Sequence, residues 1–103
     1  MAVEEFNGIG FYHEYAVAYC MCGLIYDDLG HFELAIEYYN KAIRLYPEYI
    51  SAYYFRGCTN QKLGKKAKAT ADFEKCISLT DDPRLKEGVR QYINGWKHFE
   101  IRT

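Results

Sequence analysis

Three histidines and four cysteines are the residues that could hold a metal ion or act as nucleophiles. His13, His31 and His98 lie far apart in the chain, and no cysteine–histidine pair has the spacing of a zinc ligand set. No glycine-rich loop leads into Lys-Ser or Lys-Thr, the pattern that cradles a nucleotide phosphate. These residues predict no enzyme, no metal site and no cofactor.

The cysteines favour a structural role. Cys20 and Cys22 are two residues apart on a predicted helix, so their side chains diverge by roughly 200° and do not easily share a metal or a disulfide. A free cysteine behaves as a small apolar residue, and a redox or zinc site is the alternative. The N-terminal residues lack the basic and apolar regions of a signal peptide, so we expect a cytoplasmic protein with reduced thiols.

The composition limits the classes of partner. A chain of 103 residues makes one domain, and with 17% aromatic residues much of its core must come from Tyr and Phe. The net charge of −1 argues against a dedicated nucleic-acid binder, which needs a basic surface. No apolar run approaches the ~20 residues of a membrane span. The expected partner is therefore a protein or a peptide.

Four lysines gather in one short segment, Lys62, Lys65, Lys66 and Lys68. We interpret them as a solvated turn that aids solubility. The alternative is a contact with a phosphate or an acidic protein.

The elements that must position all these residues occur twice, 34 residues apart. Tyr19-x3-Gly23 returns as Tyr53-x3-Gly57, and Leu29-Gly30 returns as Leu63-Gly64. Further pairs are Ala35 with Ala69, Tyr39 with Phe73, and Ala42 with Cys76. A fixed period with matching residue sizes predicts a stack of one supersecondary unit.

This pattern resembles the tetratricopeptide repeat (TPR) family, in units at about 16–49 and 50–82. The resemblance implies an all-α helix-turn-helix repeat array (an α-solenoid) of five helices and no strand. We expect helices at about 12–28, 32–46, 50–63, 66–80 and 83–99 within a domain at 12–103, after a flexible arm at 1–11. Gly30 and Gly64 suit the left-handed residue that ends a helix.

The last predicted helix has the features of a cap. Val89, Tyr92, Ile93 and Trp96 follow one helical face and are expected to cover the second repeat. Pro83 lies 36 residues after Pro47, so two residues are inserted before this helix. No N-terminal cap precedes Tyr15, Tyr19 and Tyr26, so the first repeat is expected to leave an open apolar edge.

The second repeat departs from the family pattern at three positions. Arg56 stands where leucine is usual, Asn60 where tyrosine is usual, and Asp81 where proline is usual. An unpaired polar side chain at a buried position costs a few kcal/mol. We therefore expect Arg56 to pair with a carboxylate, either Asp72 or Glu87.

The resemblance also implies a binding surface, because ligand peptides of this family usually lie in the concave groove of the first helices. The positions implied here are Val17, Cys20, Leu24, Asp27, Ser51, Tyr54, Cys58, Gln61, Glu87, Arg90, Asn94 and Lys97. One end of this groove is apolar and the other polar to basic. The alternative is that Val17 and Leu24 pack on the arm, through Phe6, Ile9 or Phe11.

These features predict a non-enzymatic protein-interaction module, an adaptor or scaffold that binds a peptide segment in its groove. The subclass that grips chaperone tails is disfavoured, because Cys20 and Leu24 stand where it has lysine and asparagine. The alternative function is an assembly piece that self-associates through the uncapped N-terminal edge as a homo-oligomer.

Overall fold

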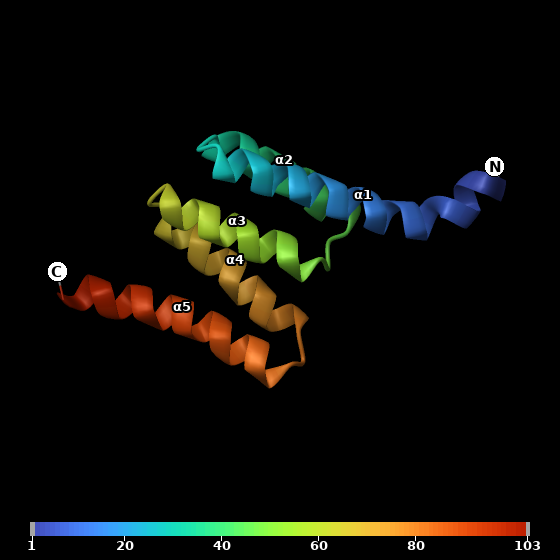
Figure 1. The fold of residues 1–103 in the computed structure, drawn as a ribbon. Helices are drawn as coiled ribbons and strands as arrows, with labels where there is room; N and C mark the ends of the chain where they lie inside the picture. Colours follow the sequence, from blue (N-terminus) through green and yellow to red (C-terminus); the bar gives the residue numbers. More distant parts are fainter. Residues whose placement is uncertain (1, 103) are drawn as a thin grey trace.

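The computed structural model describes the backbone of residues 2–102 and the side chains of residues 12–95. This range holds five helices and no strand, which confirms the predicted all-α array (Figure 1). The helices are α1 (Ala2–Asp28), α2 (Phe32–Leu45), α3 (Ile50–Lys62), α4 (Lys66–Leu79) and α5 (Pro83–Arg102).

The first helix begins earlier than the sequence predicted. The backbone is helical from Ala2, where an irregular arm was expected as far as residue 11. Gly8 and Gly10 disfavour a helix by about 1 kcal/mol each relative to Ala, but no proline forces the chain out of it. At the other end, α5 continues to Arg102, three residues past its predicted end.

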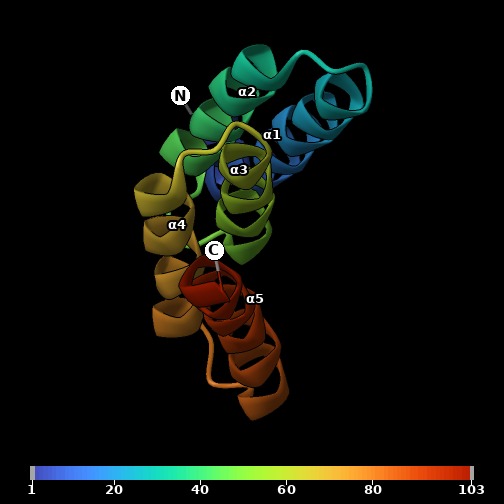
Figure 2. The same cartoon turned by 90° about the vertical axis from the view of Figure 1, so that its left-hand side faces the viewer.

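The helices are arranged in two layers, with α1, α3 and α5 on one side and α2 and α4 on the other (Figure 2). The turns within the two repeats are alike. Gly30 and Gly64 have φ of 83° and 76°, the left-handed conformation expected of them. The next backbone amide in each turn donates to a carbonyl of the preceding helix. His31 N–H donates to Tyr26 O, and Lys65 N–H donates to Asn60 O, both at 2.9 Å. This bond pattern closes both helix ends in the same way.

A glycine and a ring hold the two helices of each repeat close together. A methyl group at Gly23 would come within 2.7 Å of Tyr39 Cδ1, and one at Gly57 within 2.8 Å of Phe73 Cε1. Both rings are fully buried, with Ala35 and Ala69 in the same cores. These small residues let the two helices of each repeat approach closely.

Helix α5 covers the second repeat as a cap. Val89 and Ile93 are buried in one cluster with Tyr53, Phe73 and Cys76, as the cap prediction required. Tyr92 stacks on Phe73 with ring centroids 5.5 Å apart, although much of its side chain is exposed. The predicted contact of Trp96 lies outside the described side chains.

Of the two carboxylates expected as partners of Arg56, Asp72 and Glu87, the structure pairs it with Asp72. Arg56 Nη2 donates to Asp72 Oδ1 at 2.7 Å, and its Nε donates to Oδ2 at 3.0 Å. This paired geometry is the strong form of an arginine–carboxylate contact.

Candidate functional site

The groove positions predicted on α1 are mostly used in packing. Val17 is exposed, Leu24 is partly buried against the first core, and Cys20 is buried. Burial raises the pKa of the Cys20 thiol to about 11. Cys20 is therefore part of the core and not of an accessible groove wall. The predicted packing of Val17 and Leu24 on Phe6, Ile9 or Phe11 involves side chains outside the described part.

Asp27 forms a polar clasp between α1 and α3. Its side chain is only 8% exposed, and its Oδ1 accepts a hydrogen bond from Lys62 Nζ at 2.6 Å. Its Oδ2 accepts a short hydrogen bond from the Thr59 hydroxyl. Because both oxygens are taken, Asp27 joins the two repeats and is not an open groove residue. The sequence analysis missed this, since both partners lie more than 30 residues away.

The groove positions predicted on α3, Ser51, Tyr54, Cys58 and Gln61, are all partly exposed. Tyr54 reaches across to α5, where its hydroxyl donates to the Tyr92 hydroxyl at 3.0 Å. The two rings meet edge to face with centroids 5.8 Å apart. Burial and this hydroxyl contact raise the pKa of Tyr54 above its ordinary value.

A pocket of about 510 Å³ opens between α3 and α5 beside these two tyrosines. Over the described residues, no Cα atom of α5 lies within 8 Å of one in α3, whereas α1 and α3 do approach this closely. The Tyr54 and Tyr92 side chains meet across this gap, and the pocket lies beside them. The pocket is lined by Ile50, Ser51, Tyr54, Arg84, Leu85, Gly88, Val89 and Tyr92.

The α5 residues of this pocket differ from those predicted for the groove. Glu87, Arg90 and Asn94 are exposed but do not line it, and the Lys97 side chain lies outside the described part. The reason is that the pocket opens on the side of α5 that faces α3. The sequence held a signal for it: Gly88 lies 36 residues after Ala52, the offset between Pro83 and Pro47. A glycine in place of a buried alanine leaves space, and a methyl group at Gly88 would meet no atom within 4 Å.

The described residues contain no group of His, Cys, Asp and Glu that could hold a metal ion. The four cysteines are free thiols, and burial raises the pKa of Cys58 and of Cys76, the latter to about 12. No helix in the described part of the chain is long and apolar enough to span a bilayer.

Two family models match this chain, both described as tetratricopeptide repeat, at residues 16–49 and 50–83. The chain belongs to the TPR family. TPR repeats are a non-catalytic type of module that generally mediates protein–protein interaction. The first matched unit covers α1 from residue 16 onward together with α2, and the second covers α3 and α4, which leaves α5 as the added cap of this TPR domain.

A curated relative of this TPR domain is the UDP-N-acetylglucosamine–peptide N-acetylglucosaminyltransferase of Giardia intestinalis. It is 40% identical over 60 residues, which make up 58% of this chain and 4% of the relative. The similarity therefore concerns repeat architecture and carries no catalytic activity over to this chain.

Proposed function

We propose that this TPR domain binds an extended peptide segment of a partner protein, with an apolar side chain anchored between α3 and α5. The observation that carries this proposal is the 510 Å³ pocket, open toward the α3 positions that the family uses for ligands. A concave, largely apolar site with a few polar groups at its edge is the usual form of a ligand pocket.

The lining defines the peptide chemistry. Ile50, Leu85 and Val89 supply apolar surface, and the Tyr54 and Tyr92 rings add rigid aromatic area that loses little entropy on binding. Arg84 is the cationic member of the lining. The matching segment has an apolar or aromatic anchor next to an acidic residue.

Gly88 offers a direct test. Peptides selected from a random display library would be titrated against the parent chain, Gly88→Leu and Gly88→Ala. Leucine would occupy the pocket and weaken binding by roughly tenfold or more. Alanine has a similar helix propensity but leaves most of the space open, so it is the matched control. Equal binding by all three proteins would refute the pocket as the site.

Three further substitutions examine individual contacts, the third as a comparison. Tyr54→Ala should weaken the selected peptide by about 1 kcal/mol or more, since large rings dominate such interfaces. Arg84→Gln should lower affinity mainly at low salt, whereas Arg90→Gln, on the same helix outside the pocket, should have a smaller effect. A larger effect of Arg90→Gln than of Arg84→Gln would favour the α5 positions first predicted from sequence.

A second candidate is self-association through α1, and it is favoured by an exposed apolar stripe. Val17, Met21, Ile25 and Leu29 follow one another at four-residue spacing, and Ile25 and Leu29 are 58% and 64% exposed. Tyr19 and Tyr26, first expected on this edge, instead pack beside Tyr38. Sedimentation equilibrium would test it: Ile25→Lys should abolish a concentration-dependent dimer, and a parent chain that stays monomeric excludes this candidate.

A further inference from the structure

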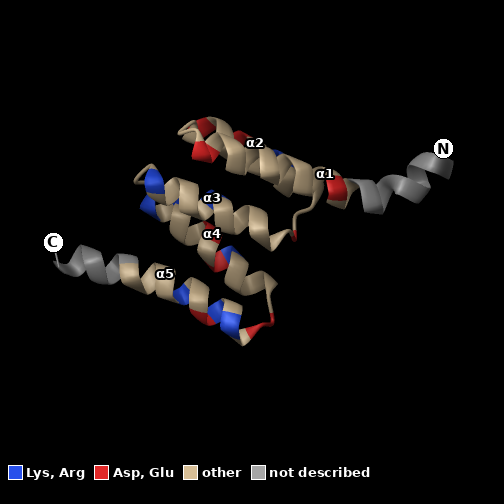
Figure 3. Ribbon diagram, in the orientation of Figure 1, with Lys and Arg blue, Asp and Glu red and all other residues tan. Residues whose placement is uncertain are grey.

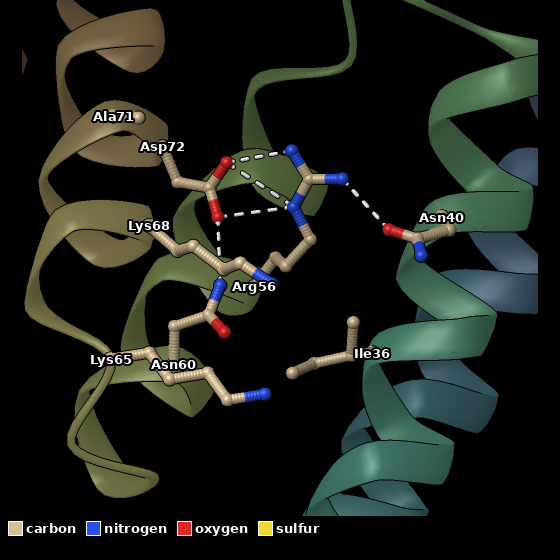
Figure 4. Close-up of a pocket in the computed structure, with 8 residues that line it drawn as sticks. All are labelled: Ile36, Asn40, Arg56, Asn60, Lys65, Lys68, Ala71 and Asp72. Atoms are coloured by element: carbon tan, nitrogen blue, oxygen red, sulfur yellow. Dashed lines mark hydrogen bonds and ion pairs between the residues drawn. The ribbon is translucent and has the colours of Figure 1, made fainter.

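The side of the molecule formed by α2 and α4 carries a second, polar pocket of about 340 Å³ at the seam between the repeats. Its walls come from α2, α3, α4 and the turn before α4 (Figure 4). The lining residues are Ile36, Asn40, Arg56, Asn60, Lys65, Lys68, Ala71 and Asp72. None of them belongs to the pocket between α3 and α5.

Arg56 forms the centre of this pocket and is held by neighbours on both sides. Asp72 accepts its Nε and Nη2 hydrogens, and Asn40 Oδ1 accepts from its Nη1 at 2.7 Å (Figure 4). Asn60 Nδ2 also donates to Asp72, at 3.3 Å. The Asp72 carboxylate is thus already satisfied by protein donors, and Arg56 still has one free N–H on each terminal nitrogen.

Two lysines add positive charge that no described residue neutralises. Lys65 and Lys68 extend from the start of α4 into the pocket (Figure 4). Neither has an ion pair or hydrogen-bond partner among the described side chains. With Arg56 positive and Asp72 negative, the pocket has a net charge of +2. Figure 3 shows basic residues at the end of α3 and the start of α4.

The first repeat shows that the fold does not require this charge. The positions 34 residues earlier than Arg56, Asn60, Lys65, Lys68 and Asp72 hold Cys22, Tyr26, His31, Leu34 and Tyr38. There the Tyr26 and Tyr38 rings stack with centroids 5.3 Å apart. A buried ion pair is often no more stabilising than well-packed apolar residues of similar volume. Stability alone therefore does not account for five polar side chains at one place.

We propose that this pocket binds a phosphate group, carried on the side chain of a partner segment or on a free phosphate ester. A phosphate monoester has a charge of about −1.5 to −2 at pH 7, which matches the unneutralised charge of the pocket. Its three oxygens accept hydrogen bonds, and the free donors are the two lysine ammonium groups, the remaining Arg56 hydrogens and the Asn40 amide. A carboxylate would leave one positive charge uncompensated.

The test is a titration followed by nuclear magnetic resonance at constant ionic strength. The probes are inorganic phosphate, a Gly-Ser peptide with one phosphoserine, and the same peptide unphosphorylated. We expect saturable shifts of the Arg56 Nε–H and of the Asn40 and Asn60 side-chain amides with both phosphate probes only. Tighter binding of the phosphopeptide points to a partner's side chain, and tighter binding of inorganic phosphate to a free ester. Linear, unsaturated shifts would overturn the proposal.

Charge-matched variants separate a site from a general basic surface. Lys65→Gln with Lys68→Gln should weaken phosphate binding by roughly tenfold or more, since each removes a charge-assisted hydrogen bond. Lys75→Gln with Lys86→Gln removes the same charge outside the pocket and should leave affinity nearly unchanged. Equal losses would overturn the proposal. Lys68→Leu, which copies Leu34 of the first repeat, is a second variant should the double one fold poorly.

Discussion

The two repeats place different chemistry at the same positions of one scaffold. In the first, the Tyr26 and Tyr38 rings stack on each other, and Tyr26 packs against the first core. In the second, the corresponding Arg56 and Asp72 form a bidentate ion pair. Both hairpins share the glycine and the ring that bring their helices together. The scaffold is therefore set by a few small–large contacts, and the neighbouring positions are free to vary in polarity.

The seams between successive repeat units differ as well. Asp27 closes the seam between α1 and α3 by accepting from Thr59 and Lys62. Gln61 lies 34 residues after Asp27, and Gly95 lies 36 residues after Thr59. These two residues therefore hold the corresponding positions at the seam between α3 and α5. No such clasp forms among the described residues there, and the tyrosine pair stands beside an open pocket. A missing clasp and a missing side chain at Gly88 together leave the space that the proposed peptide would fill.

The largest effect is expected from removing the carboxylate that distinguishes the second repeat. Asp72→Ala leaves the Arg56 charge without its partner in a mostly buried site. Loss of one member of a buried pair costs about 3–5 kcal/mol, and the 25% exposure of Arg56 reduces this to about 2–3 kcal/mol. Urea unfolding followed by circular dichroism measures it.

Two controls belong with that measurement. Glu74→Ala removes an exposed acid from the same helix and should change stability by less than about 0.5 kcal/mol. Arg56→Leu combined with Asp72→Ala should be less destabilised than Asp72→Ala alone, because no unpaired charge remains. A double variant as unstable as the sum of both single changes would contradict this account of the second repeat.

The sequence predicted the features that depend on the period and on local rules. The two hairpins, the glycine helix ends, and the cap through Val89 and Ile93 followed from residue type and spacing. So did the need of Arg56 for a carboxylate, although the sequence left Asp72 and Glu87 open and only the structure identifies Asp72. The groove was predicted less well, because the gap between α3 and α5 depends on the distance at which α5 packs. Asp27 was assigned to the groove because its partners, Thr59 and Lys62, are distant in sequence and unremarkable in type.

Replacing the glycine of each repeat by alanine tests how tightly the two cores are packed. Gly23→Ala and Gly57→Ala both press on a buried ring, and overpacking typically costs about 1–3 kcal/mol. Better helix propensity offsets up to about 1 kcal/mol of this. We expect net losses of about 1–2 kcal/mol, greater at Gly23, where the ring lies nearer. Thermal unfolding of the two variants tests it, and Gly88→Ala, which meets no atom, should raise the melting temperature instead.

The ring hydroxyl of Tyr39 marks a smaller difference between the cores, since Phe73 has none. Within the described structure this hydroxyl is buried without a hydrogen-bond partner, and burial raises the pKa of Tyr39. Removing an unsatisfied buried group relieves its desolvation cost, so Tyr39→Phe should leave stability unchanged or raise it by up to about 1 kcal/mol. A clear loss in chemical denaturation would show that the hydroxyl has a partner, with the nearby Thr59 the first to examine.

The smallest effect concerns the clasp that distinguishes the α1–α3 seam. The hydrogen bond to Asp27 raises the pKa of Lys62, so the folded state favours the charged ammonium. This contribution is fully present below the unfolded pKa, about 10.4, and is lost as the pH rises through the higher folded value. Lys62 is half exposed, so Lys62→Met should cost only about 0.5 kcal/mol at pH 7.

The pH dependence of that difference identifies its cause. The stability difference between the parent and Lys62→Met, followed by chemical denaturation, should shrink as the pH rises from the unfolded pKa, about 10.4, through the raised folded pKa, because the ammonium then loses its proton in both states. Lys65→Met, three residues on and without a described carboxylate partner, should show no such loss at pH 7. If both methionine variants were equally destabilised, the effect would reflect general surface charge. The Asp27–Thr59 hydrogen bond alone would then hold α1 and α3 together at this seam.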